Sequence, residues 1–173
     1  MFVGNRGAAD GRGGVRSAPG TAPTPPLFPK PDRPMMADDS KIDHVGIAVN
    51  SLEEAVPLWR DLLGEAPSGR EEVEGESVRV AFFGRGAGRV ELLEPTDPDS
   101  AVGRHLRRRG EGVHHVCLRV DDLEAAVDRA TGRGAELIPP GVREGAGGHR
   151  VAFLHPRSTG GVLLELSEPP EES

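Results

Sequence analysis

The sequence predicts an α+β fold made of two repeated β-α-β-β-β modules. The first observation behind this prediction is an internal repeat, because residues 43–56 and 114–127 are identical at seven of fourteen positions at a constant offset of 71. The triplet Val-Ala-Phe at 80–82 recurs at 151–153 with the same offset. The second observation is that each copy opens with an alternating apolar segment and a capped helical pattern. Self-similarity at a constant period indicates a duplicated structural unit, and alternation of period two indicates a strand.

In the first copy, the alternating residues 41–49 predict a strand whose odd-numbered side chains from Val45 to Val49 pack against a helix. Ser51 can cap that helix, acidic residues occupy its first turn, and Gly64 marks its end. Pro57 falls inside the helical pattern and predicts a weakened or bent segment. Three short strands are then expected at 67–74, 77–84 and 88–94.

The second copy has the same order of elements. A strand is expected at 113–120, and a helix capped by Asp121 or Asp122 is expected to end near Gly134. Three short strands follow at 136–139, 149–155 and 161–167. The stretch Asp97–Gly110, between the two copies, predicts a short helix rich in arginine.

These elements define one expected domain at 41–168, between an N-terminal extension at 1–40 and a tail at 169–173. Its expected parts are module one at 41–96, a linker at 97–111 and module two at 112–168.

The N-terminal extension is rich in glycine and proline and has no helical or strand period, so we expect it to be disordered. The pair Met35 and Met36 favours translation starting there, which would make the preceding residues non-native. The alternative is a targeting segment, because the extension is rich in arginine and poor in acidic residues, as transit peptides are. We therefore expect a cytoplasmic protein, or a mitochondrial one if the extension is a transit peptide.

The composition excludes several classes of partner and site. The net charge of −7, with five Phe, one Trp and no Tyr, argues against nucleic-acid binding. No apolar run approaches the ~20 residues that span a bilayer, so no membrane partner is expected. Cys117 is the single cysteine, which excludes an internal disulfide framework and a multi-cysteine metal site.

The repeat brings two His and two Glu to equivalent positions: His44 matches His115, and Glu91 matches Glu165 after three extra residues in the second copy. Alternation puts both histidines on the strand face opposite the packed one, beside small residues. With pseudo-twofold symmetry these four side chains can converge on one divalent metal ion, and imidazole with carboxylate suits Co²⁺, Mn²⁺, Fe²⁺, Ni²⁺ or Zn²⁺. The alternative is that the repeat preserves packing and that each histidine is a satisfied polar residue.

The other histidines and the cysteine are weaker candidates. We expect His114 to be structural, His105 to be exposed and His155 to lie in a turn. His149 follows two glycines and can reach the cleft, although a surface loop is the favoured interpretation. Cys117 shares a strand face with His115, but no base is placed to make it a nucleophile.

Four sequence blocks stand out in the expected domain: Ile42-Asp43-His44-Val45-Gly46-Ile47-Ala48-Val49, Glu91-Leu92-Leu93-Glu94-Pro95, Gly110-Glu111-Gly112-Val113-His114-His115-Val116 and the block from His155 to Leu166. Together they resemble the vicinal oxygen chelate superfamily and, within it, the methylmalonyl-CoA epimerase family. The first block is typical of the superfamily, and the last two are more specific. The resemblance covers nearly the whole expected domain and none of residues 1–40.

The resemblance implies a glyoxalase-like fold in which curved sheets enclose a metal cleft, and it implies a homodimer. The cofactor it implies is one divalent metal ion, Co²⁺ first, with Mn²⁺, Ni²⁺, Zn²⁺ or Mg²⁺ as alternatives. The family's ligands fall on His44, His115 and Glu165, with a fourth at Glu91. Some members carry a glutamate base near the position of Val80, where this chain has no carboxylate.

The activity implied is metal-dependent epimerisation of (S)- and (R)-methylmalonyl-CoA through an enolate, as in propionyl-CoA metabolism, which makes the protein an isomerase with an acyl-CoA substrate. Inversion needs a base and an acid on opposite faces of a planar intermediate, and Glu91 and Glu165 are the expected catalytic pair. The alternatives are a glyoxalase-type isomerase, an extradiol-type dioxygenase and a metal-free drug-binding module.

The phosphates of coenzyme A require a local basic patch in this acidic chain. The favoured candidate is Arg157, because Gly160 and Gly161 beside it allow close backbone approach. Other candidates are Arg104, Arg107, Arg108, Arg109, Arg143 and Arg150. The alternative is that these arginines only solubilise an exposed rim.

Overall fold

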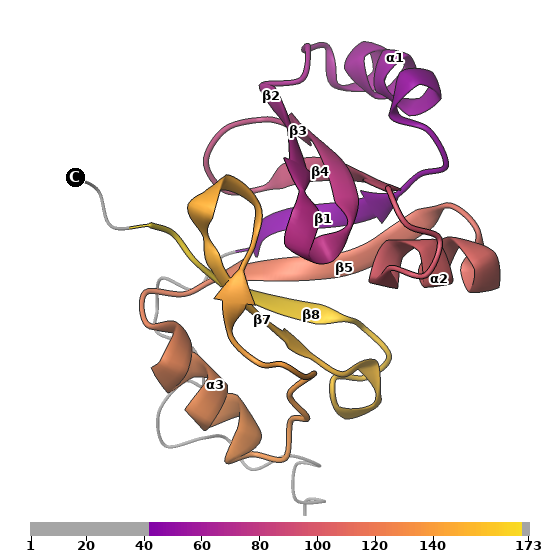
Figure 1. Ribbon diagram of the computed structural model, residues 1–173. Coiled ribbons are helices and arrows are strands. Elements are labelled where there is room, and N and C mark those ends of the chain that lie inside the picture. Colours follow the sequence, from indigo (N-terminus) through magenta and orange to yellow (C-terminus); the bar gives the residue numbers. More distant parts are fainter. Residues whose placement is uncertain (1–41, 171–173) are drawn as a thin grey trace, which may run out of the picture. The chain divides into compact units, whose positions relative to one another are not determined.

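One curved eight-stranded sheet organises residues 42–170, the part of the chain that the computed structural model describes (Figure 1). Residues 42–170 fall within a single compact unit. The strands are β1 Ile42–Ala48, β2 Gly69–Val73, β3 Val78–Phe83, β4 Arg89–Pro95, β5 Gly112–Arg119, β6 Arg143–Glu144, β7 Arg150–Leu154 and β8 Leu164–Glu168. The helices are α1 Leu52–Leu63, α2 Ala101–Arg109 and α3 Leu123–Thr131. The expected disorder of residues 1–40 lies outside the described residues.

The strand order is β2-β3-β4-β1-β5-β8-β7-β6. Read inward from the two edges, β2-β3-β4-β1 of module one corresponds to β6-β7-β8-β5 of module two. β1 and β5 pair antiparallel at the centre, and each pairs parallel with the last strand of its own module, β4 or β8. Both halves follow the order β-α-β-β-β, with α2 between them. The predicted α+β fold of two repeated modules is therefore confirmed.

The helix ends follow from local sequence. The side chain of Ser51 accepts a hydrogen bond from the Glu54 backbone, and Gly64 adopts a left-handed conformation after the last residue of α1, as predicted. α1 runs without interruption through Pro57. Asp122 caps α3, but this helix ends at Thr131 rather than near Gly134. The chain leaves α3 through a tight turn, in which the Gly134 amide donates to the Thr131 carbonyl.

The strand expected at 136–139 is reduced to a single antiparallel bridge between Leu137 and Leu154 of β7. Two hydrogen bonds hold this segment beside β7, from Ile138 N to Phe153 O and from His155 N to Glu136 O. Pro139 and Pro140 follow and have no amide hydrogen to extend the pairing. The strand that pairs with the outer edge of β7, at its opposite end, is β6. The last strand starts at Leu164 rather than 161, because Gly160 and Gly161 turn the chain with positive φ angles.

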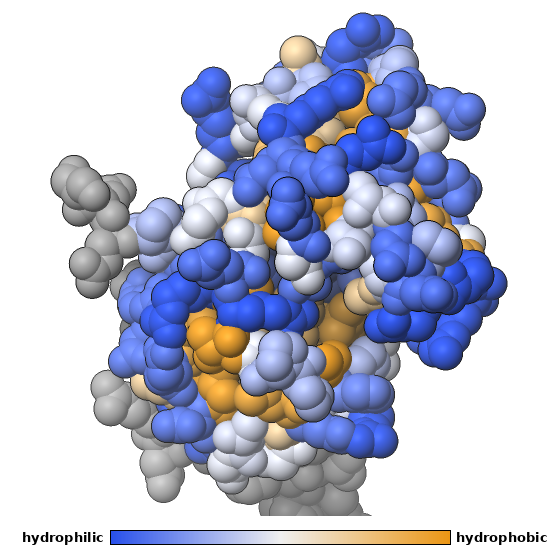
Figure 2. All heavy atoms as spheres, in the orientation of Figure 1, coloured by the Kyte–Doolittle hydropathy of each residue, from blue (hydrophilic) through white to orange (hydrophobic). Residues whose placement is uncertain are grey.

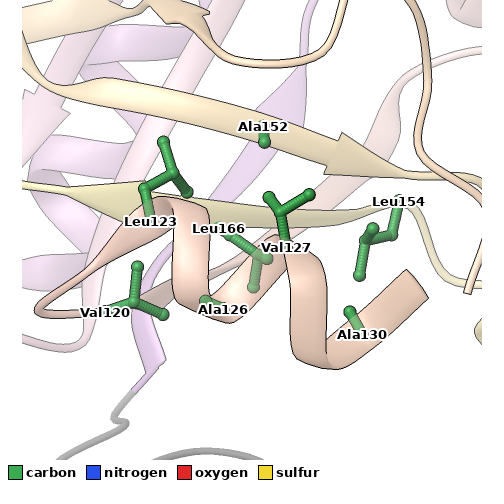
Figure 3. Packing of buried hydrophobic residues seen from close by; sticks show 8 residues of the cluster. All are labelled: Val120, Leu123, Ala126, Val127, Ala130, Ala152, Leu154 and Leu166. Carbon is green, nitrogen blue, oxygen red and sulfur yellow. The ribbon is translucent and has the colours of Figure 1, made fainter. Parts of the chain in front are cut away.

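Each module packs its helix against one face of its own strands. In module two, Leu123, Ala126, Val127 and Ala130 of α3 point toward Ala152 and Leu154 of β7 and Leu166 of β8 (Figure 3). The equivalent cluster of module one joins Leu52 and Val56 of α1 to Val49, Ala81, Phe83 and Leu92. Fully burying one such aliphatic side chain stabilises the fold by about 1.5–3 kcal/mol. With the helices on this face, the opposite face of the central strands is available for a site.

Candidate active site

Four adjacent strands, β4, β1, β5 and β8, carry the predicted site residues Glu91, His44, His115 and Glu165 in that order. All four residues are buried, with 5–6% of their surface exposed. The pairing register explains how they fit. Gly46 lies opposite both Glu91 and His115, and its repeat counterpart Cys117 lies opposite both His44 and Glu165. Small residues in the two central strands therefore leave room for the larger polar ones beside them.

Three of the four residues direct ligand atoms at one another. The Nε2 atoms of His44 and His115 are 3.1 Å apart. The Oε2 atom of Glu165 is 2.9 Å from Nε2 of His115 and 3.7 Å from Nε2 of His44. These atoms all lie within 4.8 Å of one another. Such a compact set of two imidazoles and one carboxylate is the donor set of many divalent metal sites.

Glu91 lies beside this group and faces the other nitrogen of His44. Its Oε1 atom is 3.3 Å from Nδ1 of His44. Burial raises the pKa of Glu91, which favours its neutral form more than in water. The structure therefore brings His44, His115 and Glu165 together and leaves the fourth predicted residue on a different side of the same imidazole.

Asp43 and Arg89 support the site and were not identified from the sequence. Oδ2 of Asp43 lies 2.9 Å from Nδ1 of His44, and Arg89 forms an ion pair with the same carboxylate. Burial would raise the pKa of Asp43, but hydrogen bonds with His44 and Arg89 lower it below its usual value. Burial would likewise lower the pKa of His44, but hydrogen bonds with Asp43, Cys117 and Glu165 raise it to about 12, so binding of a metal ion at this imidazole requires release of a proton. The Asp-His pair at the start of the first strand was the available signal.

The site therefore fits a divalent metal ion by its donor set and by its surroundings. A carboxylate on Nδ1 of a ligating histidine fixes the tautomer and presents Nε2 to the ion. Burial would raise the pKa of Glu165, but hydrogen bonds from His115 and His44 hold it well below the usual range. This keeps the carboxylate ionised, the form that binds metal.

The four residues lie in a cavity with mainly apolar walls. In Figure 2, apolar side chains are visible within the hollow of this face and hydrophilic ones surround it. Module one contributes Val78, Val80 and Phe82 from β3. Glu76 of the short helix η1 (Glu74–Glu76) forms an ion pair with Arg143 of β6, which links the two modules beside the cavity.

Comparison with known proteins agrees with this geometry. The profile of the glyoxalase/bleomycin resistance protein/dioxygenase superfamily matches residues 43–153. The chain belongs to this superfamily. The predicted resemblance to the vicinal oxygen chelate superfamily is therefore confirmed, and divalent metal binding is typical of its members.

Among its relatives in the superfamily, the chain is 36% identical to human mitochondrial methylmalonyl-CoA epimerase over 129 residues, which cover 74% of this chain and 73% of the human protein. A solved structure of a methylmalonyl-CoA epimerase in complex with methylmalonyl-CoA and NH₄⁺ is 36% identical, with a TM-score of 0.73, and the match covers 76% and 96% of the two chains. A Streptomyces coelicolor methylmalonyl-CoA epimerase in complex with 2-nitronate-propionyl-CoA has 36% identity, a TM-score of 0.72 and coverages of 76% and 98%.

Of the other histidines, some lie in surroundings that differ from those predicted. His149 lines the cavity, and its Nδ1 is 2.9 Å from the Ser167 hydroxyl, so the surface-loop interpretation is wrong. The ring of His114 also lines the cavity, with its Nδ1 3.0 Å from Nδ1 of His115. His105 packs its ring against His114 and is only half-exposed. His155 lies in a turn, as expected, where its ring accepts a hydrogen bond from the Arg157 backbone.

The arginines favoured by the sequence lie in two different surroundings. The guanidinium of Arg157 is paired with Glu136 and does not line the cavity. A second hollow adjoins the cavity and shares His114, Ile138 and Leu163 with it. This hollow is lined by α2 through Arg104, His105, Arg108 and Arg109, and by Gly161 on the other side. Gly160 turns the chain beside it with a positive φ angle.

Within residues 42–170, no helix is long and apolar enough to cross a membrane.

Proposed function

We propose that this protein is a metal-dependent epimerase that interconverts the (S) and (R) forms of methylmalonyl-CoA. The observation that carries the proposal is the convergence of His44, His115 and Glu165 in an apolar cavity, in a chain 36% identical to methylmalonyl-CoA epimerases over most of its domain. The glyoxalase-type, dioxygenase and drug-binding alternatives have no comparable support.

The metal ion of this proposal would be held by Nε2 of His44, Nε2 of His115 and a carboxylate oxygen of Glu165, and Glu91, which faces Nδ1 of His44, would lie beside it. Co²⁺ is the proposed ion, and Mn²⁺, Ni²⁺, Zn²⁺ and Mg²⁺ are alternatives. When bound, a divalent cation lowers the energy of negative charge that develops on a thioester oxygen.

The protein's own residues must move a proton at the α-carbon beside the thioester. Of the predicted pair, Glu91 is the better suited, because it lies on module one beside the three converging atoms and its pKa is raised by burial. The Oε2 atom of Glu165 lies 2.9 Å from Nε2 of His115 and 3.7 Å from Nε2 of His44, which places it in the ligand role. The apolar β3 side chains Val78, Val80 and Phe82 keep water from an enolate that would otherwise be protonated on either face.

The second hollow supports an acyl-CoA rather than a small free acid as the substrate. It continues from the cavity along α2, and its arginines could contact the anionic phosphates of coenzyme A. Arg108 and Arg109 form no ion pair with other residues in the described part of the chain, whereas Arg107 is paired with Asp99. The homodimer and the cytoplasmic or mitochondrial location remain predictions, and light scattering of the purified protein would test the first.

The proposal is tested by proton NMR of racemic and of single-epimer methylmalonyl-CoA in D₂O. With Co²⁺-loaded protein we expect the α-proton to exchange for deuterium and each single epimer to become a mixture. Protein treated with a chelator is the control, and it should regain activity when Co²⁺ is restored. Absence of exchange and of epimerisation with every one of the five ions would exclude this function.

Glu91→Gln tests the role of the proposed proton-transfer residue. We expect epimerisation to fall by about 100-fold or more, because general acid–base catalysis by a positioned group contributes about 10²–10⁴-fold. Metal content is measured in parallel, since loss of the ion would explain the same result. Retained activity with full metal content would argue against a proton-transfer role for Glu91.

A further inference from the structure

The cavity wall formed by β7 differs from its counterpart in module one. His149, Val151 and Phe153 alternate along the chain and all three line the cavity. At the repeat offset of 71, the counterparts of His149 and Val151 are Val78 and Val80 on β3, and Phe153 matches Phe82. Module one therefore has an entirely apolar strand face at this place, and module two has a titratable side chain.

The imidazole of His149 is held in one orientation and has a free nitrogen. Its Nδ1 lies 2.9 Å from the hydroxyl of Ser167, which is itself buried on β8. Among the residues described by the structure, Nε2 has no hydrogen-bond partner. The ring is half-buried at the cavity wall. A fixed imidazole with one unpartnered nitrogen at a cavity is suited to accept or donate a proton.

Burial at the cavity wall favours the neutral form of the His149 imidazole. Burial, the largest effect, lowers the pKa of His149. A neutral imidazole is the form that can remove a proton.

The other titratable side chains of the cavity already have partners. Glu76 is paired with Arg143, and the ring of His114 contacts His115. Glu165 is paired with His115 and lies 3.7 Å from Nε2 of His44. Glu91 belongs to β4, in the half of the sheet opposite to β7. Proton transfer on the two faces of the α-carbon can therefore use one group from each module, Glu91 from module one and His149 from module two.

We propose that His149 is the second proton-transfer residue of the epimerase reaction and acts on the face of the α-carbon opposite to Glu91. This inference rests on the proposed function. In one direction Nε2 of His149 takes the α-proton, and the electron pair of the broken C–H bond enters the enolate. Glu91 in its protonated form gives a proton to the opposite face, and a new C–H bond forms with inverted configuration. His149 ends protonated and Glu91 ionised, and the reverse reaction or exchange with water restores the starting state.

The test compares proton exchange from each epimer in D₂O with wild-type protein and with His149→Asn. Asparagine keeps a polar atom within reach of Ser167 and removes Nε2. We expect epimerisation to fall by about 100-fold or more. In this variant the epimer that Glu91 deprotonates should still exchange its α-proton for deuterium. For the epimer that His149 deprotonates, the exchange rate should fall as much as the epimerisation rate. Glu144→Gln on the adjacent hairpin, exposed and outside the cavity, is the matched control and should behave as the wild type.

A loss of exchange that is equal for both epimers, or epimerisation within about threefold of wild type, would overturn the role of His149. Wild-type protein that exchanges neither epimer would instead overturn the proposed function, and the role of His149 with it. Co²⁺ content and melting temperature are measured for each variant. If His149→Asn does not fold, His149→Gln is judged by the same two exchange rates.

Discussion

Gly46 lies directly across the β1–β5 pair from His115, and a Cβ atom at position 46 would lie 2.3 Å from Cε1 of that imidazole. This separation is far below van der Waals contact, so the ring of His115 occupies the space that any larger residue would need. The missing side chain on β1 is therefore what allows the imidazole on β5 to turn toward His44 and Glu165.

Gly46→Ala is predicted to displace the imidazole of His115 and to weaken metal binding. We expect the affinity for Co²⁺ to fall by about tenfold or more, as for other changes that disturb the orientation of a ligand. Calorimetric titration of metal-free protein measures the effect. Gly69→Ala in β2 is the control, because a Cβ atom there has only an ordinary contact of 3.7 Å with Phe82. An unchanged affinity in Gly46→Ala would mean that the ring is not held where the geometry requires it.

Asp43→Asn is predicted to weaken metal binding through the orientation of His44. The variant loses the carboxylate that holds Nδ1 at 2.9 Å and leaves Arg89 without its ion pair. We expect the Co²⁺ affinity to fall by about 10–100-fold, the usual effect of removing such a partner. Asp61→Asn, on the exposed face of α1, removes a carboxylate far from the site and should have no effect. Equal affinities for both variants would show that Asp43 is dispensable.

Much of this arrangement could be predicted because the repeat constrains it. Equivalent strands place equivalent side chains on the same face, so the convergence of His44 with His115 followed from alternation and symmetry. Asp43 could not be assigned from alternation, because its contact with Arg89 of β4 depends on the parallel pairing of β1 with β4. His149 reached the cavity through positive φ angles at Gly147 and Gly148, and a glycine can adopt these without a sequence signal for their direction.

Leu123→Ala is predicted to destabilise module two without changing the site chemistry. Leu123 is completely buried where α3 meets the sheet (Figure 3), and its truncation leaves a cavity. We expect the free energy of unfolding to fall by about 2–5 kcal/mol, measured by urea denaturation. The control is Leu62→Ala on α1, where the side chain is 69% exposed and a change near zero is expected. A similar small change in both variants would contradict the packing of α3.

The ion pair between Arg157 and Glu136 is predicted to be lost at low pH. The hydrogen bond from Arg157, the largest effect, lowers the pKa of Glu136 below its ordinary value of 4.5. A lowered folded-state pKa means that the ion pair stabilises the fold above about pH 4.5 and is lost as the pH falls through the lowered value. In Arg157→Ala we expect the pKa of Glu136 to rise to its ordinary range, measured by NMR titration. Because both groups are exposed, the effect on unfolding should be small, and an unchanged pKa would contradict the pairing.

Arg108 and Arg157 lie in different surroundings, and this difference predicts which of them contacts coenzyme A. Arg108 lines the hollow that adjoins the cavity and has no partner among residues 42–170, whereas Arg157 is held by Glu136 outside both cavities. A charge-assisted contact with phosphate contributes about 1.5–3 kcal/mol. We therefore expect Arg108→Ala to raise KM for methylmalonyl-CoA by about tenfold and to weaken inhibition by free coenzyme A. The increase should shrink as salt screens the contact, and the metal content should stay constant.

Arg157→Ala serves as the matched comparison and should leave KM within twofold. The reverse result would restore Arg157, with Gly160 and Gly161, as the phosphate contact that the sequence favours.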